Sequence, residues 1–236
     1  MLHDIILFFA GILVGSVNAV AGGGMLIGFP ILLALGMPAL IANATGNLVV
    51  LPGNISATFG YRKYLNRVPK TYLVLLIPAI IGSALGALVL RHTSSTKFTQ
   101  IIPGLIIFAA ILFAFQPYLY RKIHKHIHSV KGRKMSFKTI TFISFAILPV
   151  CFYGGYFGPG FGFIMLAFLG FTGLHNHIHR MNTLKCIIGI CIASTSLIVL
   201  YSSHLINWRQ GLIMGTGNLF GGYYGALGIQ KVSTHT

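Results

Sequence analysis

The chain has 236 residues, of which 55% are hydrophobic and only 8% are charged, whereas soluble domains carry about a quarter charged residues. Its 17 lysines and arginines accompany a single acid, Asp4, and lie almost wholly between apolar runs. This pattern excludes an ordinary soluble domain and favours a protein embedded in lipid. It argues against nucleic acid as a partner, because no basic face of a soluble domain is present.

Nine apolar runs follow one another along the chain. Five approach the roughly 20 residues that cross a bilayer: residues 40–59, 71–90, 101–120, 184–205 and 210–229. The other four are shorter and form two pairs, residues 5–20 with 25–36 and residues 137–153 with 161–174. A helix of about 13 residues rises only about 20 Å, less than a hydrocarbon core of about 30 Å. Each pair therefore predicts a broken helix, a tilted hairpin or a re-entrant pair.

Glycines interrupt both short pairs. The first interruption is Asn18-Ala-Val-Ala-Gly-Gly-Gly24, and the second is Gly154-Gly-Tyr-Phe-Gly-Pro-Gly-Phe-Gly162. In lipid, non-helical backbone is tolerated only where protein buries it or where it lines a cavity. Two such breaks at corresponding places in two halves indicate the binding site of a transporter.

The order of short pair, long run, polar loop and glycine-containing long run occurs twice, which predicts a duplication. An offset of 138 residues aligns Gly22 with Gly160, Gly24 with Gly162 and Thr45 with Thr183, and an offset of 139 aligns 82–88 with 221–227. We expect an all-α polytopic membrane protein of two inverted repeats, with about seven to nine membrane segments that include short broken or re-entrant helices. The predicted divisions are a first transmembrane repeat at residues 1–120, a basic linker at 121–138 and a second repeat at 139–236.

Charge counting favours two crossings for each short pair. One side of the membrane then holds 14 lysines and arginines, and the other holds only Arg91, Lys97 and Arg209. A single crossing per pair divides them 12 to five. By the positive-inside rule, the central basic loop and the C-terminus are cytoplasmic and the N-terminus lies outside. The two halves then have opposite orientations in a multi-pass protein of a bacterial-type plasma (inner) membrane.

These segments resemble the sulfite exporter TauE/SafE family. The motifs that carry the resemblance are the first break with downstream Pro30, Ala44-Thr45-Gly46-Asn47, the second break, Asn182-Thr183-Leu184-Lys185 and Gly221-Gly-Tyr-Tyr-Gly-Ala226. The resemblance covers nearly the whole chain. It implies a permease or exporter of small anions, often sulfur oxyanions such as sulfite or sulfonates. One departure is Ala-Thr-Gly-Asn where the family often has Ala-Thr-Asn-Lys, so the first half lacks the lysine that the second half keeps as Lys185.

We expect an anion site built mainly from backbone N–H groups at the breaks. An anion that leaves water needs donors to replace its hydration, and the N-terminus of a helix offers them. The candidate substrate-binding residues are Asn18, Gly22, Gly23, Gly24, Thr45, Asn47, Gly158, Gly160, Gly162, Asn182, Thr183 and Lys185. No catalytic residue, metal site or cofactor is predicted.

Each candidate has a second interpretation. Glycines at short spacing also permit close helix packing, which we predict for Gly11-x3-Gly15, Gly82-x3-Gly86 and Gly221-x3-Gly225. Asn54, Ser56 and Thr58 are expected to form interhelical hydrogen bonds rather than to bind a ligand. Lys185 begins an apolar run, so its side chain has two alternatives, an intramembrane functional role or snorkelling to the interface.

Two groups of alternating histidines invite a metal hypothesis: His124, His126 and His128, and His175, His177 and His179. Helical ligands need spacings of three or four residues, and no acid or thiolate lies close by in sequence. A titratable interfacial surface is therefore favoured over a metal site.

Three classes of function stay open from the residues. The favoured one is a secondary anion transporter that works by alternating access; the others are an anion-selective channel and a non-transport membrane enzyme or assembly protein. An enzyme is disfavoured because no evident base accompanies Ser194, Ser196 or a cysteine. The expected partners are a small anionic substrate and the lipid bilayer, and a homodimer is left open, as is the coupling ion.

Overall fold

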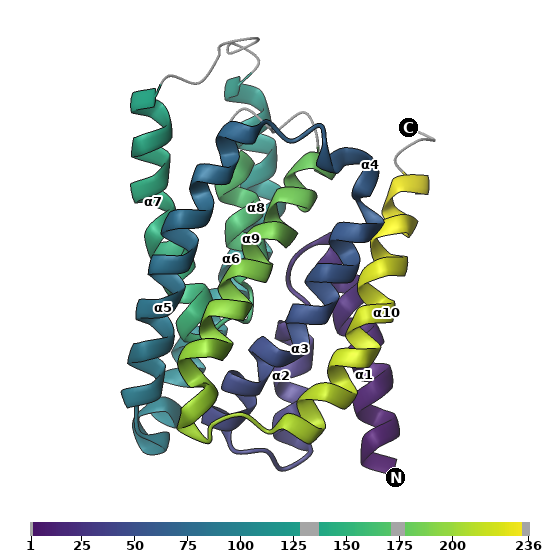
Figure 1. The fold of residues 1–236 in the computed structure, drawn as a ribbon, viewed down its shortest axis with the longest axis vertical. Coiled ribbons are helices and arrows are strands. Elements are labelled where there is room, and N and C mark those ends of the chain that lie inside the picture. The colour runs from purple at the N-terminus through teal and green to yellow at the C-terminus, as the bar shows by residue number, and fades with distance from the viewer. Residues whose placement is uncertain (1, 128–136, 171–177, 233–236) are drawn as a thin grey trace.

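The computed structural model describes residues 2–127, 137–170 and 178–232, and every regular element in those ranges is helical (Figure 1). The elements of the first half are α1 (Leu2–Val20), α2 (Met25–Ala34), α3 (Ala39–Gly60), α4 (Arg62–Leu65), the 3-10 segment η1 (Lys70–Leu75) and α5 (Leu76–His92). Those that follow are α6 (Ser95–Ile127), α7 (Phe137–Tyr156), α8 (Phe161–Gly170), α9 (Ile178–Leu200), the 3-10 segment η2 (Tyr201–Ser203) and α10 (Trp208–Val232). The predicted all-α polytopic membrane architecture is confirmed.

The helices differ in how well they suit a membrane crossing. Within the described ranges, three are long and apolar enough by length and composition: Leu2–Val20, Lys70–His92 and Ile178–Ser203. The first was predicted to be short, but α1 begins at Leu2 and its 19 residues rise about 28 Å. Helices α3 and α10 have 22 and 25 residues, and polar side chains lower the hydropathy of α3. Helices α2 and α8 have 10 residues each, so each rises only about 15 Å, half of a bilayer core.

The two short helices return to opposite faces of the bundle. In Figure 1 the N-terminus and the connection from α2 to α3 lie at the lower end, whereas α4 and the last turn of α10 lie at the upper end. Helix α7 begins at the upper end and α8 leads back to it. The α1–α2 pair and the α7–α8 pair are therefore hairpins of opposite orientation, as the charge count predicted.

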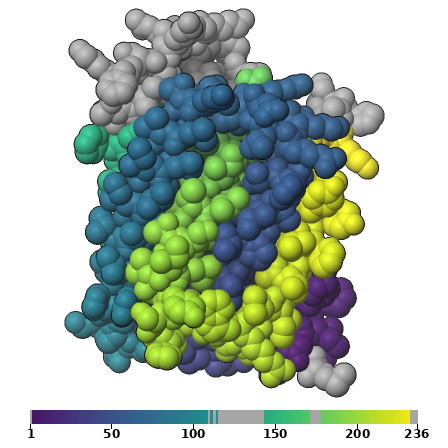
Figure 2. All heavy atoms as spheres, viewed as in Figure 1, coloured from purple at the N-terminus to yellow at the C-terminus, as the bar shows by residue number. Residues whose placement is uncertain are grey.

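Six helices form a symmetric row in which the two halves exchange partners. Along the row α7 packs on α5, α5 on α9, α9 on α3, α3 on α10 and α10 on α1. Figure 2 shows part of this row as a continuous surface in which α5, α9, α3 and α10 lie side by side. The helix that opens each half, α1 or α7, thus packs against a glycine-containing long helix of the other half, α10 or α5.

Glycines make the outer contacts of the row close. A Cβ at Gly11 or Gly15 of α1 would overlap the α10 backbone at Met214 or Asn218, and a Cβ at Gly86 of α5 would overlap α7 at Phe152. The other predicted packing glycines, Gly82, Gly221 and Gly225, also face the backbone of a neighbouring helix. The packing role predicted for these glycine pairs is confirmed, and such contacts stabilise helix association in lipid, where burial from water contributes little.

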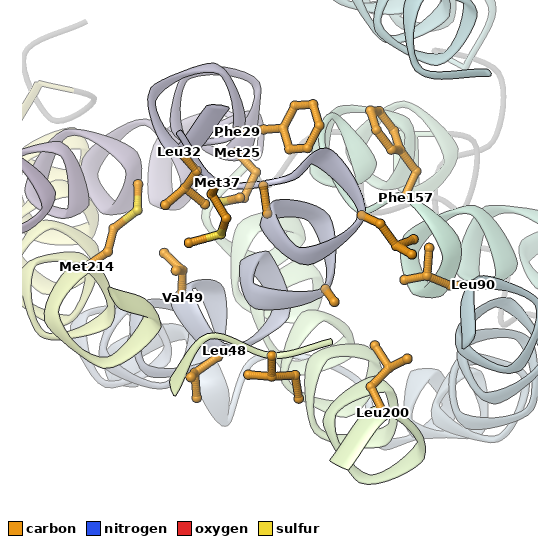
Figure 3. Close-up of a cluster of buried hydrophobic side chains, with 14 of the residues drawn as sticks. Met25, Phe29, Leu32, Met37, Leu48, Val49, Leu90, Phe157, Leu200 and Met214 are labelled. Carbon is orange, nitrogen blue, oxygen red and sulfur yellow. The ribbon is translucent and has the colours of Figure 1, made fainter. Parts of the chain in front are cut away.

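The largest apolar cluster surrounds α2 (Figure 3). It includes Met25, Phe29 and Leu32 of α2, with Leu48 and Val49 of α3. The rings of Phe29 and Phe157 meet edge to face, with centroids 5.7 Å apart. Phe157 follows α7 directly, so this contact fixes the short helix of one half against the break of the other.

Candidate functional site

Both glycine breaks end a long helix in the same way. At the end of α1 the amides of Ala21 and Gly22 both donate to the Val17 carbonyl, at 2.8 and 3.3 Å. At the end of α7 the amides of Phe157 and Gly158 both donate to the Tyr153 carbonyl, at 2.8 and 3.2 Å. Gly22 and Gly158 then take φ values of +88° and +78°, which residues with a Cβ adopt only at a cost. The chain can therefore turn away from each helix axis at once.

This shared geometry corrects the predicted register of the repeat. Gly22 corresponds to Gly158, an offset of 136, and not to Gly160 at 138. Helices α2 and α8, which start at Met25 and Phe161, keep the offset of 136. Four residues separate α2 from α3 whereas seven separate α8 from α9, so the offset becomes 139 at the starts of α3 and α9. The second glycine run offers several glycines, and only the hydrogen bonds that close each helix identify the equivalent one.

The two breaks touch each other through their backbones. A Cβ added to Gly22 would overlap the main chain of Gly162, and a Cβ added to Gly162 would overlap that of Gly22. Gly23 lies under the ring of Phe163, and Gly24 lies against the Val14 carbonyl. Gly23 and Gly24 thus serve close packing, the second interpretation of the sequence, whereas Gly22 and Gly162 also border a cavity.

The cavity lies where both breaks meet α3 and α9. The space open to the centres of water molecules is about 50 Å³, enough for a few waters or one small ion. It is lined by Asn18, Gly22, Met25, Asn43, Gly46, Asn47, Val50, Asn54, Gly154, Phe157, Gly158, Pro159, Phe161, Gly162, Lys185, Gly189, Ile192 and Ala193. Among these residues only Lys185 carries a formal charge, and amides supply the other polar side chains.

Lys185 is buried inside the bundle, with 2% of its surface exposed. Its Nζ donates to the carbonyls of Asn18 and Ala19 at 2.6 and 3.3 Å, and to Asn182 Oδ1 at 3.0 Å. The two carbonyls belong to the last turn of α1, where the helix dipole places partial negative charge that favours a cation. The structure therefore rejects the snorkelling alternative. Lys185 holds the end of α1 and presents the single charge at the cavity.

Asparagine amides extend this network around the cavity. Asn18 Nδ2 donates to Asn54 Oδ1 at 3.0 Å, which joins α1 to α3. Asn43 Nδ2 donates to the Tyr156 carbonyl at 2.8 Å and so holds the end of α7. Asn43 Oδ1 and Asn182 Nδ2 are buried without a hydrogen-bond partner. Because an unpaired buried amide group is costly, Asn43 Oδ1, whose residue lines the cavity, can gain from a polar ligand or water there.

The lining positions of α3 and α9 correspond at an offset of 139. Asn43 matches Asn182, Gly46 matches Lys185, and Asn54 matches Ala193. Asn182 does not line the cavity itself but accepts a hydrogen bond from Lys185. The position that carries the buried cation in the second half thus carries a glycine in the first.

Six of the twelve predicted site residues line the cavity: Asn18, Gly22, Asn47, Gly158, Gly162 and Lys185. The other six are Gly23, Gly24, Thr45, Gly160, Asn182 and Thr183, none of which is among the lining residues. Thr45 Oγ1 accepts a hydrogen bond from the Asn207 amide at 3.0 Å, and Thr183 Oγ1 donates to the His179 carbonyl at 2.7 Å. Both threonines therefore have structural partners outside the cavity.

Sequence reasoning missed Asn43 and Gly46, and it assigned Asn54 to helix contacts alone. Asn43, Gly46, Asn47, Val50 and Asn54 are spaced by one, three or four residues on α3, the spacing of a single helix face. The shared helix face of these residues is the sequence feature that could have identified them as cavity-lining. The interhelical bond predicted for Asn54 is confirmed, but Ser56 and Thr58 bond to carbonyls of their own helix at Gly53 and Asn54.

Backbone donors also remain at both helix starts. In the described part of the chain, the amides of Gly23, Gly24 and Met25 at the start of α2, and of Gly160 and Gly162 at the start of α8, make no backbone hydrogen bond outside the helices. Of these five residues, Met25 and Gly162 line the cavity. The first N–H groups of a helix have no partner within it. These groups are the donors that the sequence assigned to an anion.

A metal site is not evident among the described residues, which contain no group of three or more His, Cys, Asp or Glu side chains placed to hold an ion. His128, His175 and His177 lie outside the described residues. His179 stacks on Tyr64 with ring centroids 4.8 Å apart, beside the basic helix α4.

Comparison with known proteins places the chain in a family. The family described as Sulfite exporter TauE/SafE matches residues 7–236. A "Probable membrane transporter protein" of Haemophilus influenzae is 30% identical over 230 residues, which cover 94% of this chain and 83% of the relative. The "Probable membrane transporter protein YfcA" of Escherichia coli is 29% identical over 229 residues, which cover 94% of this chain and 78% of the relative. YunE of Bacillus subtilis is 27% identical, covering 98% and 90%.

No solved structure matches the chain. The family match extends over both glycine breaks, the cavity and the closing helix α10. The chain therefore belongs to the TauE/SafE sulfite exporter family, a family of membrane transporters.

Proposed function

We propose that this protein is a secondary transporter that binds a small anion in the cavity between its two glycine breaks. The observation that carries the proposal is the meeting, at one buried cavity, of both breaks with the sole lining cation, Lys185. Its substrates would be sulfite, sulfonates or related sulfur oxyanions, the class that the family name indicates.

The cavity offers what such an anion needs. Amide side chains and the free N–H groups at the starts of α2 and α8 can replace its hydration shell. The aromatic rings of Phe157 and Phe161 line the same space and would accommodate an apolar substituent. No serine, cysteine or histidine is among the lining residues, which supports a binding role over hydrolysis.

Alternating access would follow from the paired hairpins. Helices α2 and α8, with 10 residues each, lie between the cavity and opposite faces of the bundle. A small rotation of one hairpin would open the cavity to one face while the other hairpin keeps it closed, as in other transporters with inverted repeats.

The orientation in the membrane is part of the proposal. Arg62, Lys63, Arg67 and Lys70 are exposed around α4 at the upper end of Figure 1, whereas Arg91 and Arg209 lie at the lower end. The positive-inside rule would then put the upper end, where α7 begins and α10 ends, in the cytoplasm of a bacterial-type cell. We propose the same side for the central loop and the C-terminus. Residues 1–120 and 139–236 would be the two repeats, joined by the basic linker 121–138, of which the structure describes residues 121–127 and 137–138.

Flux through proteoliposomes tests the proposal. The purified protein is reconstituted and offered sulfite, methanesulfonate, thiosulfate and a carboxylate such as acetate. We expect saturable uptake of at least one of the sulfur oxyanions, accelerated by the same anion inside the vesicle. Lys185→Met should strongly reduce this uptake, and Lys63→Met, a change of an exposed lysine in α4, should leave it intact. Non-saturable flux without acceleration would indicate a channel, and no flux of any anion would contradict transport of this class.

A further inference from the structure

The hydrogen-bond acceptors around Lys185 Nζ match an ammonium group. Its Nζ has three hydrogen-bond acceptors within 3.3 Å: two carbonyls of α1 and Asn182 Oδ1. An ammonium group has three N–H donors and no acceptor, which matches this set. A neutral amine has only two protons, so one acceptor would face a lone pair. Three acceptors and no donor around Nζ therefore favour the charged form.

The positive charge is only partly balanced by the protein. The last turn of α1 supplies partial negative charge, equivalent to about half an elementary charge. No carboxylate is among the lining residues. The single acid of the chain, Asp4, lies near the N-terminus of α1 and pairs with Arg209 at 3.2 Å. Nothing on the cavity wall therefore neutralises the remainder of the Lys185 charge.

We propose that the cavity accepts one net negative charge at a time, and that Lys185 makes this selection. The inference rests on the proposed transport function and specifies the charge of its substrate. A monoanion would bring the formal charge of the occupied site to zero. A dianion of the same size would bring one uncompensated negative charge into a site of low dielectric, where unpaired charge is strongly disfavoured.

The membrane potential should act on only one step of the proposed transport cycle. With a monoanion bound, the carrier moves no net charge at the site when it changes its accessibility. When empty, the site carries the Lys185 charge through the same change. One elementary charge that crosses the whole field shifts an equilibrium by up to about 50-fold per 100 mV. The return of the empty carrier is therefore the voltage-dependent step.

Two nearly isosteric probes separate charge from shape. Methanesulfonate is a monoanion, and sulfate is a dianion of almost the same form. In proteoliposomes we expect methanesulfonate uptake to exceed sulfate uptake by about tenfold or more. With methanesulfonate on both sides, exchange should not change when a potential is imposed with potassium and valinomycin. Net uptake into empty vesicles should rise when the vesicle interior is made positive.

The results distinguish this inference from the proposed function. Sulfate uptake equal to that of methanesulfonate, or methanesulfonate exchange that depends on voltage, would overturn the charge inference while leaving transport established. Absence of uptake for both anions would overturn the proposed function and the charge inference with it.

Two substitutions assign the selection to Lys185. Lys185→Arg keeps the charge and should keep voltage-independent exchange, even where the rate falls. Lys185→Gln keeps hydrogen-bonding capacity without the charge, so any remaining exchange should become voltage-dependent. If Lys185→Gln does not fold, two measurements still test the inference: exchange by Lys185→Arg, and the ratio of methanesulfonate to sulfate uptake by the parent protein. Loss of the methanesulfonate preference in Lys185→Arg would show that charge is not what Lys185 contributes.

Discussion

The C-terminal end of α1 is held by the Lys185 ammonium of α9, whereas the C-terminal end of α7 is held by the Asn43 amide of α3. Both donors come from the third helix of the opposite half, and both satisfy carbonyls that a helix end leaves without a partner. In lipid those carbonyls have no water to bond with. One structural requirement is thus met by a neutral group in one half and by a cation in the other, and only the cation brings charge to the cavity.

Substituting the glycine that ends each long helix at the two breaks should have the largest effects on stability. Gly22→Ala combines a positive φ with overlap of the Gly162 backbone, so we expect a loss of about 4 kcal/mol or more and little folded protein. At Gly158 the nearest atom to an added Cβ is 3.5 Å away, so Gly158→Ala should cost only about 1–2 kcal/mol of backbone strain. Thermal unfolding of the purified variants measures the difference.

Gly104→Ala is the control for these two variants, because an added Cβ at Gly104 meets nothing within 4 Å and its φ is not positive. It should unfold like the parent protein. Equal destabilisation by Gly22→Ala and Gly158→Ala would contradict the observed contact between the breaks.

Removing the cation should have the next largest effect. Lys185→Met leaves three buried acceptors without a donor, and truncating one partner of a buried charged network costs about 2–5 kcal/mol. Methanesulfonate uptake should fall about 30-fold or more. Asn43→Ala, which removes the corresponding neutral donor, should reduce uptake far less. Comparable losses would show that the two donors act alike and that charge has no special role.

Giving the first half its own lysine should sharpen the comparison. Gly46 occupies the position equivalent to Lys185, and a Cβ there meets the flexible end of Met25 at 2.7 Å. Gly46→Lys combined with Met25→Ala should therefore place a second cation at the cavity. We expect the ratio of sulfate to methanesulfonate uptake to rise about tenfold. The control is Gly46→Gln with Met25→Ala, which adds similar bulk without charge; a rise in that variant too would assign the change to cavity shape.

The smallest effects should come from the two equivalent asparagines. Asn182 accepts a hydrogen bond from a buried cation, whereas Asn43 donates to a neutral carbonyl. Hydrogen bonds to charged groups contribute about 1.5–3 kcal/mol and neutral ones about 0.5–1.5 kcal/mol. Asn182→Ala should therefore lower the unfolding temperature more than Asn43→Ala. The reverse order would indicate that the Lys185 charge is satisfied without Asn182.

The sequence was enough to predict both broken hairpins and their opposite orientations. Glycines within apolar runs and lysines between them are local signals that do not depend on tertiary contacts. The register between the halves was not predictable, because the run from Gly154 to Gly162 contains five glycines and residue type alone does not say which one ends α7. That choice depends on where the Tyr153 carbonyl closes the last turn.

The depth of Lys185 depended on a helix boundary. Its apolar run starts at residue 184, which suggested a lysine near the membrane surface, but α9 begins at Ile178. The helix continues through Asn182 and Thr183 because their side chains bond within the protein. Asn182 and Thr183 lower the hydropathy of this segment but belong to α9, so Lys185 lies further from the start of the helix than the apolar run suggested.

The exchange of partners between halves also sets the order in which the protein can be completed. Helix α1 emerges first during synthesis, yet its principal partner, α10, is the last helix of the chain. Until α10 arrives, the small-residue surface of α1 around Gly11 and Gly15 has no counterpart. During synthesis, α1 therefore lacks its principal packing partner until all the other helices have been inserted. Truncation before α10 would therefore leave the α10-facing surface of α1, at the start of the chain, without its partner.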